Sequence, residues 1–203
     1  MNAKARNMGL RAVTAKRETR SPNLNRSSLI SLIEDTINES KLLDISTKLD
    51  GLSFAYLAFK DWGPTPIAHY NMNFVPGQPD EMLNKLGIYF MASLGQGDSY
   101  YEGLYGPLPV NGHEAKLAYL YGFSVNDESI SDERADNTAY TILIIFFPRC
   151  LVGYFQSAFK IISKVLVRTF NDIKDIKELT ASLLVKIKDE LKFSIEYWHF
   201  LSL

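Results

Sequence analysis

The sequence predicts an α+β fold in which helices pack against a five-stranded antiparallel sheet. Three observations lead to this prediction. Residues 52–70 have the pattern of two strands joined by a tight turn, residues 138–147 are almost wholly apolar and β-branched or aromatic, and residues 151–198 carry apolar side chains at helical spacing. The predicted element order is strand, strand, helix, three strands and two helices, which is typical of a layered α+β architecture.

The predicted hairpin begins with a strand, 52–59, whose two faces are both largely apolar. Gly63 permits a positive φ and Pro64 lacks an amide donor, so the chain is expected to turn there. Pro66 opens the returning strand.

A helix is predicted over 79–94. Pro79 suits the first helical position, and Asp80 and Glu81 suit the positive end of the helix dipole. Apolar residues follow at helical spacing, and Gly95 ends the helix.

Three further strands are expected after this helix. The first covers 99–110 and is interrupted at Gly106 and Pro107. The strand 116–125 alternates regularly, as expected when one face is buried. The run 138–147 has no such alternation, which predicts a strand buried on both faces near the centre of the sheet.

The chain is predicted to contain a disordered basic tail (1–27), a short helix (28–44, with its end near Leu43) and one domain (45–203) that ends in helices over 151–170 and 176–198. Residues 1–28 carry seven basic side chains and one acidic one, although the whole chain has a net charge of −1. The tail could make weak contact with an anionic membrane or could be solvated without a partner, and we expect no nucleic-acid partner.

The single cysteine and the absence of a long apolar run favour a cytoplasmic protein, with a peripheral membrane location left open.

The element order resembles that of the longin fold, and two segments add to the resemblance. The run 59–67 (FKDWGPTPI) is similar to the turn between the first two strands of longin-like domains, and 104–110 (LYGPLPV) is similar to archaeal longin-like proteins. The resemblance covers roughly residues 50–200, and the early helix at 28–43 is not part of the basic longin pattern. Longin-like and roadblock-like domains are mostly non-enzymatic platforms, so the resemblance implies a protein that binds a small GTPase or a trafficking assembly. It implies association, as a homodimer or heterodimer, through a sheet edge or a helix.

A different hypothesis is a profilin-like domain that senses a small molecule in a pocket between sheet and helices. The residues that could line such a pocket are Tyr100, Tyr101, Tyr105, Tyr119 and Tyr121.

Three residues are the candidate partner-binding site: Trp62, Pro64 and Tyr105. Trp62 and Tyr105 are large aromatic residues beside Gly-Pro breaks, where a strand cannot pair regularly, and tryptophan and tyrosine are enriched among interface hot spots. The alternative is that Trp62 folds back over the sheet edge and caps the core.

The sequence offers no catalytic constellation, no metal site and no cofactor motif, so we expect a protein that is not an enzyme. His69, His113 and His199 lie on separate elements without ligand spacing. The acidic segment 126–137 lacks the alternation of a calcium loop and is expected to be solvated. Cys150, at a helix start, is expected to be a buried or half-buried structural thiol.

Overall fold

The computed structural model describes residues 44–60, 62–96, 99–130 and 137–202. These all belong to one unit, Asn38–Leu203. The predicted tail (1–27), the predicted helix over 28–43 and the acidic residues 131–136 lie outside the described residues.

The main sheet consists of β1 (Ser53–Lys60), β2 (Gly63–Tyr70), β5 (Gly103–Pro109), β6 (Lys116–Asn126) and β7 (Thr138–Pro148). The strand order is β2-β1-β7-β6-β5, and every neighbouring pair is antiparallel. The prediction of an α+β fold with a five-stranded antiparallel sheet is therefore confirmed. The run 138–147 forms the central strand, as its uniform apolarity predicts.

The predicted third strand, 99–110, is wrong in its first part. Two short strands, β3 (Gly95–Gln96) and β4 (Ser99–Tyr100), pair with each other outside the main sheet. The chain then turns at Gly103, whose φ of +118° is readily accessible only to glycine, and β5 begins there. The expected interruption is confirmed, because the β5–β6 register shifts between Tyr105 and Leu108.

The helices are α2 (Pro79–Leu94), α3 (Val152–Ser157), α4 (Phe159–Phe170) and α5 (Ala181–Ser202), with short 3₁₀ turns η2 (Arg149–Leu151) and η3 (Ile176–Glu178). Residues 44–50 are also helical, so the predicted end of helical structure near Leu43 is wrong. Ile45 and Leu49 in this segment are buried in the core. The prediction of one continuous helix over 151–170 is wrong, since the chain bends by 78° between Ser157 and Phe159.

The bend brings two aromatic anchors onto the same face of the sheet. Phe155 of α3 stacks on Phe147 with ring centroids 4.2 Å apart, and Phe170 of α4 lies 4.2 Å from Phe123. The sequence does not signal the break, because the residue between the two helices is Ala158, which has neither the flexibility of glycine nor the constraint of proline.

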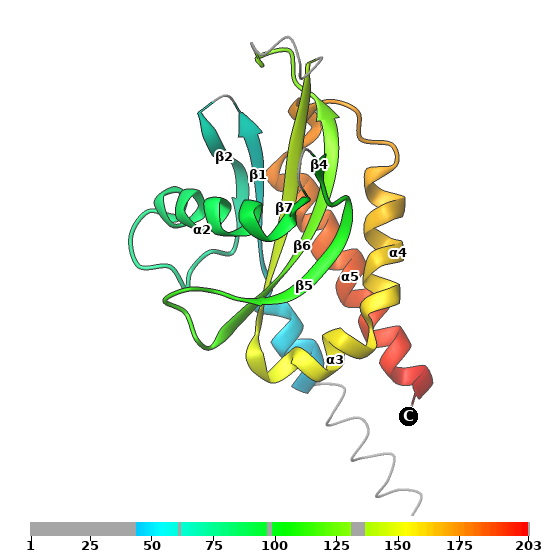
Figure 1. The fold of residues 1–203 in the computed structure, drawn as a ribbon. Coiled ribbons are helices and arrows are strands. Elements are labelled where there is room, and N and C mark those ends of the chain that lie inside the picture. The colour runs from blue at the N-terminus through cyan, green and yellow to red at the C-terminus, as the bar shows by residue number, and fades with distance from the viewer. Residues whose placement is uncertain (1–43, 61, 97–98, 131–136, 203) are drawn as a thin grey trace, which may run out of the picture. The chain divides into compact units, whose positions relative to one another are not determined.

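Each face of the sheet carries its own core. Phe54 and Tyr56 of β1 pack in the cluster formed with α3, α4 and α5, whereas Ala55 and Leu57 pack in the cluster formed with α2. Figure 1 accordingly shows α2 on one side of the sheet and α4 and α5 on the other. The alternation in the sequence predicts this division, because successive side chains of a strand point to opposite faces.

No single helix among the described residues is long and apolar enough to cross a membrane. The segments Arg149–Ser157 and Phe159–Phe170 meet the requirement in length and composition only when they are taken together across their bend. Side chains from both segments, among them Phe155 and Leu166, are fully buried in the core beneath them.

Candidate functional site

Trp62 lies at the tip of the β1–β2 hairpin and projects into solvent. Lys60 pairs with Gly63, so the strands are joined by a turn of two residues, and the φ of +108° at Gly63 requires the freedom of glycine. The side chain of Trp62 is 79% exposed, the largest value among the large hydrophobic residues that the structure describes. The alternative prediction, in which Trp62 folds back over the sheet edge and caps the core, is therefore wrong for this structure.

A surface depression lies beside the tryptophan, where β2 runs next to α2. We call it the hairpin hollow, and its volume is about 430 Å³. It is lined by Trp62, Pro64, Thr65, Pro66, Asn84 and Ile88. Ile88, on the outer face of α2, is 65% exposed. Two large apolar side chains thus stand in solvent around a hollow whose six described lining residues include no charge.

Gly87 sets the close approach of α2 to β2 beneath this hollow. A Cβ atom at this position would lie 2.5 Å from Cβ and 2.9 Å from Cγ of Pro64, which is closer than real side-chain contacts allow. The proline ring can move little to make room. The pair of Gly87 and Pro64 therefore fixes how far apart the two walls of the hollow stand.

The turn end of the hairpin is held by a largely buried ion pair. Nζ of Lys60 lies 3.0 Å from Oδ2 of Asp127, whose residue is only 3% exposed. Oδ1 of Asp127 accepts hydrogen bonds from the backbone N–H and the hydroxyl of Ser129, at 3.0 Å and 2.6 Å. The prediction that this acidic segment is wholly solvated is wrong, because its first carboxylate is paired inside the structure.

The environment of Asp127 favours the charged carboxylate. Burial alone raises its pKa, but the hydrogen bonds from Ser129 and the interaction with Lys60 outweigh burial and lower the pKa below its usual value. The turn end of the hairpin is thus tied to the loop after β6 by a charge that is present at neutral pH.

Tyr105 does not join Trp62 and Pro64 in one site. It lies on β5, and β2 and β5 are the two opposite edges of the sheet. Tyr105 is 38% exposed, and its ring packs 6.0 Å from that of Tyr101. The three predicted partner-binding residues thus lie on two separate surfaces. The hairpin hollow carries the more exposed aromatic residue of the two, Trp62.

Both edges of the sheet are interrupted by proline. Pro64 and Pro66 lie in β2, and Pro107 and Pro109 lie in or at the end of β5. Proline cannot donate a backbone hydrogen bond, so neither edge offers a complete row of donors to an added strand. A partner would therefore contact side-chain surfaces more readily than it would extend the sheet.

The tyrosines of the sensor hypothesis lie on different faces of the sheet. Tyr100 stacks on Tyr140, which belongs to the core on the α2 side. Tyr119 and Tyr121 are buried in the core on the α4 and α5 side. They do not line one common pocket.

The other candidate reactive residues lie apart. His69 is near Asp80, at 3.8 Å, whereas His113 packs against Phe74 and His199 against Tyr154. Cys150 is exposed, so the expectation of a buried or half-buried thiol is wrong. Within the part of the chain that the structure describes, no three His, Cys, Asp or Glu side chains are placed to hold a metal ion.

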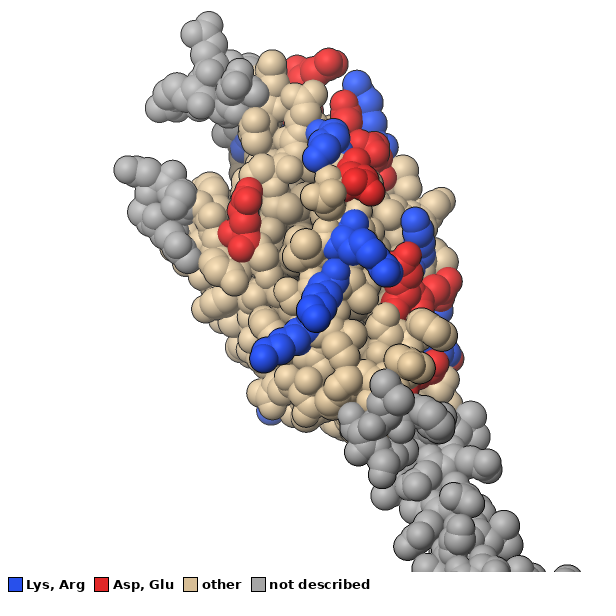
Figure 2. All heavy atoms as spheres, turned by 90° about the vertical axis from the view of Figure 1, so that its right-hand side faces the viewer, with Lys and Arg blue, Asp and Glu red and all other residues tan. Residues whose placement is uncertain are grey.

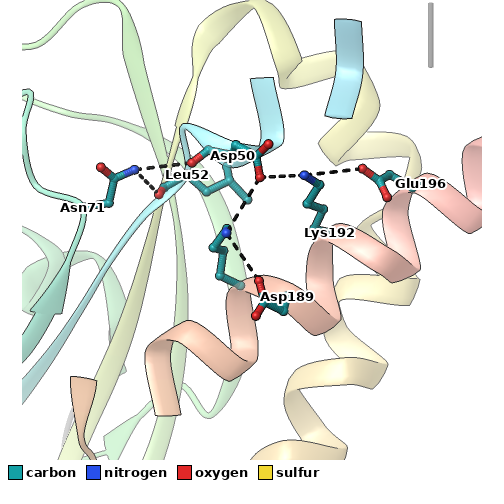
Figure 3. Close-up of polar contacts among 7 residues, drawn as sticks. Asp50, Leu52, Asn71, Asp189, Lys192 and Glu196 are labelled. Atoms are coloured by element: carbon teal, nitrogen blue, oxygen red, sulfur yellow. Dashed lines mark hydrogen bonds and ion pairs between the residues drawn. The ribbon is translucent and has the colours of Figure 1, made fainter. Parts of the chain in front are cut away.

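A polar cluster at the other end of the hairpin fixes its strands to α5 (Figure 3). Asp50 accepts a hydrogen bond of 2.6 Å from Nζ of Lys192, and this bond is the main cause of a lowered pKa at Asp50. Asn71, at the end of β2, donates to the carbonyl of Leu52 at 2.9 Å. Both ends of the hairpin are therefore anchored, and the turn with Trp62 is carried on a fixed support.

Comparison with known proteins returned no match to any family model, to any curated protein or to any solved structure.

Proposed function

We propose that this chain is a non-enzymatic interaction platform of the longin type, which binds a protein partner through the hairpin hollow. The observation that carries the proposal is Trp62, 79% exposed on a turn whose supporting strands are anchored at both ends. A large aromatic side chain that is held in solvent loses little conformational entropy on binding, and it can bury its whole apolar surface in the interface. Tryptophan is therefore enriched among interface hot spots.

The composition of the hollow supports a protein partner over a polar small molecule. Its lining combines two prolines, an isoleucine and a tryptophan with only Thr65 and Asn84 as polar side chains. Small-molecule sites usually enclose their ligand and hold it with several convergent polar groups. An apolar side chain that projects from a partner surface matches this hollow better.

The element order supports the longin resemblance. Apart from the short strands β3 and β4 and the extra helix α3, the described chain runs strand, strand, helix, three strands, helix, helix. The partner class that this resemblance implies is a small GTPase or a trafficking assembly. The proline-interrupted edges support contact through the hollow rather than through strand addition.

The proposal can be tested by affinity capture with the full-length chain as bait. Four baits are compared: the wild type, Trp62→Ala, Ile88→Ala and Val167→Ala. Val167 is the matched aliphatic control, since it is 52% exposed on α4, on the opposite face of the sheet from α2. A true partner is captured by the wild type and by Val167→Ala and is reduced by both changes in the hollow.

Capture in the presence of GDP and of a non-hydrolysable GTP analogue tests the partner class. A small GTPase should prefer one of the two nucleotide states, because its switch segments are ordered by the γ-phosphate. If the same proteins are captured by all four baits, the hairpin hollow is not the interaction site.

A further inference from the structure

The outer face of α5 exposes an apolar stripe that the core does not use. Val185, Phe193 and Tyr197 are 36%, 70% and 57% exposed, and they follow one another at spacings of eight and four residues along the helix. Such spacing places them on one side of the helix. The rings of Phe193 and Tyr197 stack nearly parallel, with an interplanar angle of 10° and centroids 6.2 Å apart.

The remaining sides of α5 are already occupied. Leu184, Ile187, Leu191 and Ile195 are fully buried against the sheet. On one flank, Lys188 and Lys192 reach Asp50 at 3.8 Å and 2.6 Å (Figure 3). On the other flank, Glu190 pairs with Arg168 of α4 at 3.1 Å. The stripe is therefore a separate surface of a helix whose rotation is fixed.

A hollow of about 510 Å³ lies along this stripe, and we call it the α5 hollow. Its lining residues are Ser182, Val185, Lys186, Asp189, Glu190 and Phe193. It thus contains apolar surface, one positive side chain and two negative ones. Both carboxylates are already paired within the chain, Asp189 with Lys188 at 3.3 Å and Glu190 with Arg168 at 3.1 Å, and the side chain of Asp189 is still 62% exposed.

Two pairs of lining residues are arranged symmetrically about one point in the first half of the helix. The pairs Ser182 with Phe193 and Lys186 with Asp189 are both centred between Ile187 and Lys188. Two copies of α5 that meet antiparallel about this centre would bring the ring of Phe193 onto Ser182 of the second copy. They would also bring each Lys186 to the Asp189 of the other chain, so opposite charges meet twice.

We propose that a second copy of this chain covers the α5 hollow, with the two α5 helices antiparallel and Phe193 of each copy in the hollow of the other. This is an isologous contact, in which one patch is complementary to itself. Figure 2 shows positive and negative side chains together on the face that contains α4 and α5.

The contact should be weak to moderate. Ser182 and Phe193 are separated by about 16 Å along the helix, at 1.5 Å per residue, so the shared stripe is short. Contacts at the small end of the size range give dissociation constants in the micromolar range. The dimer should therefore form and dissociate as protein concentration changes.

Sedimentation equilibrium of the full-length chain over micromolar to submillimolar concentrations tests this proposal. The wild type should pass from monomer to dimer, and Phe193→Asp should remain a monomer. Val167→Asp, on the outer surface of α4, is the control and should still form dimers. Circular dichroism checks that each variant remains folded.

A charge exchange tests the register. Lys186→Asp and Asp189→Lys should each weaken the dimer by about tenfold, because each places like charges together, and the double variant should regain most of the lost affinity. A wild type that stays monomeric at every concentration overturns self-association and leaves a different protein as the occupant. A dimer that survives Phe193→Asp, or a double variant that is no tighter than the single ones, overturns the antiparallel α5 contact.

Discussion

Replacement of Asp127 by asparagine should destabilise the fold more than any exposed charge change in this chain. The substitution keeps the size of the side chain and an oxygen that can accept from Ser129. It removes the negative charge that faces Lys60 at 3.0 Å. Because the Asp127 side chain is only 4% exposed and that of Lys60 20%, water can replace the lost partner of the ammonium group only in part.

The expected loss is about 2–4 kcal/mol of unfolding free energy at neutral pH. Removal of one member of a fully buried ion pair costs roughly 3–5 kcal/mol, because the other charge is left without compensation. The partial exposure of Lys60 lowers this figure, since its ammonium group can turn toward solvent. The hydrogen bond from Ser129 that asparagine can still accept lowers it further.

Urea unfolding at several pH values measures the difference between the wild type and Asp127→Asn. The pKa of Asp127 is lowered in the folded state, so its charge stabilises the fold above the unfolded-state pKa of about 3.9. This contribution is lost as the pH falls through the folded-state pKa. The difference in unfolding free energy between the wild type and Asp127→Asn should therefore be constant near neutrality and shrink below about pH 4.

Glu81→Gln is the matched control. Glu81 and Lys85 form a pair at 2.8 Å in which both side chains are 74% exposed, so the loss of this pair should leave the unfolding free energy nearly unchanged. The interpretation of Asp127 is wrong if Asp127→Asn matches this control at neutral pH. It is also wrong if the gap between the wild type and Asp127→Asn does not change on acidification.

Four further substitutions test the packing by thermal or urea unfolding. Gly87→Ala should cost about 1–3 kcal/mol by overpacking against Pro64, whereas Gly153→Ala, where nothing lies within 4 Å of the new atom, should be neutral or slightly stabilising. Equal effects at the two glycines would contradict the close approach of α2 and β2. Tyr56→Phe should be neutral or stabilising by up to about 1 kcal/mol, because the buried hydroxyl has no hydrogen-bond partner among the described residues; a loss of several kcal/mol would reveal a partner. Ile144→Asp should abolish folding, since it places an unpaired charge in the fully buried central strand, and a cooperatively melting variant would refute that placement.

The strands and helices with strong periodicity could be predicted from the sequence. The turn at Gly63 and the central position of 138–147 follow from local patterns that tertiary contacts do not override. The bend between α3 and α4 could not be predicted in the same way. It results from the packing of Phe155 and Phe170 against distant strands, and Ala158 itself gives no signal.

The candidate surfaces were only partly predictable. Trp62 and Pro64 were identified from the turn, but Ile88 completes the hollow and was missed. The signal for Ile88 was its position outside the apolar stripe of α2, and an isolated glycine within that helix, Gly87, indicated a close contact. Phe193 likewise falls outside the buried stripe of α5, so an off-stripe apolar residue would have been the clue for both surfaces.

The pairing of Asp127 could not be read from the sequence. Lys60 lies 67 residues earlier in the chain, and an acidic loop residue is usually solvated. Only the hairpin's position beside the loop after β6 explains why this carboxylate is buried while its neighbour Glu128 is exposed.

The central claim is that Trp62 anchors a protein partner, and its most direct test is the affinity of one captured partner for two purified chains. Isothermal titration should give a dissociation constant at least about tenfold higher for Trp62→Ala than for the wild type. The melting temperatures should agree closely, because a side chain that is 79% exposed contributes little to the core. Unchanged affinity together with a lowered melting temperature would contradict the claim and would place Trp62 among the residues that stabilise the fold.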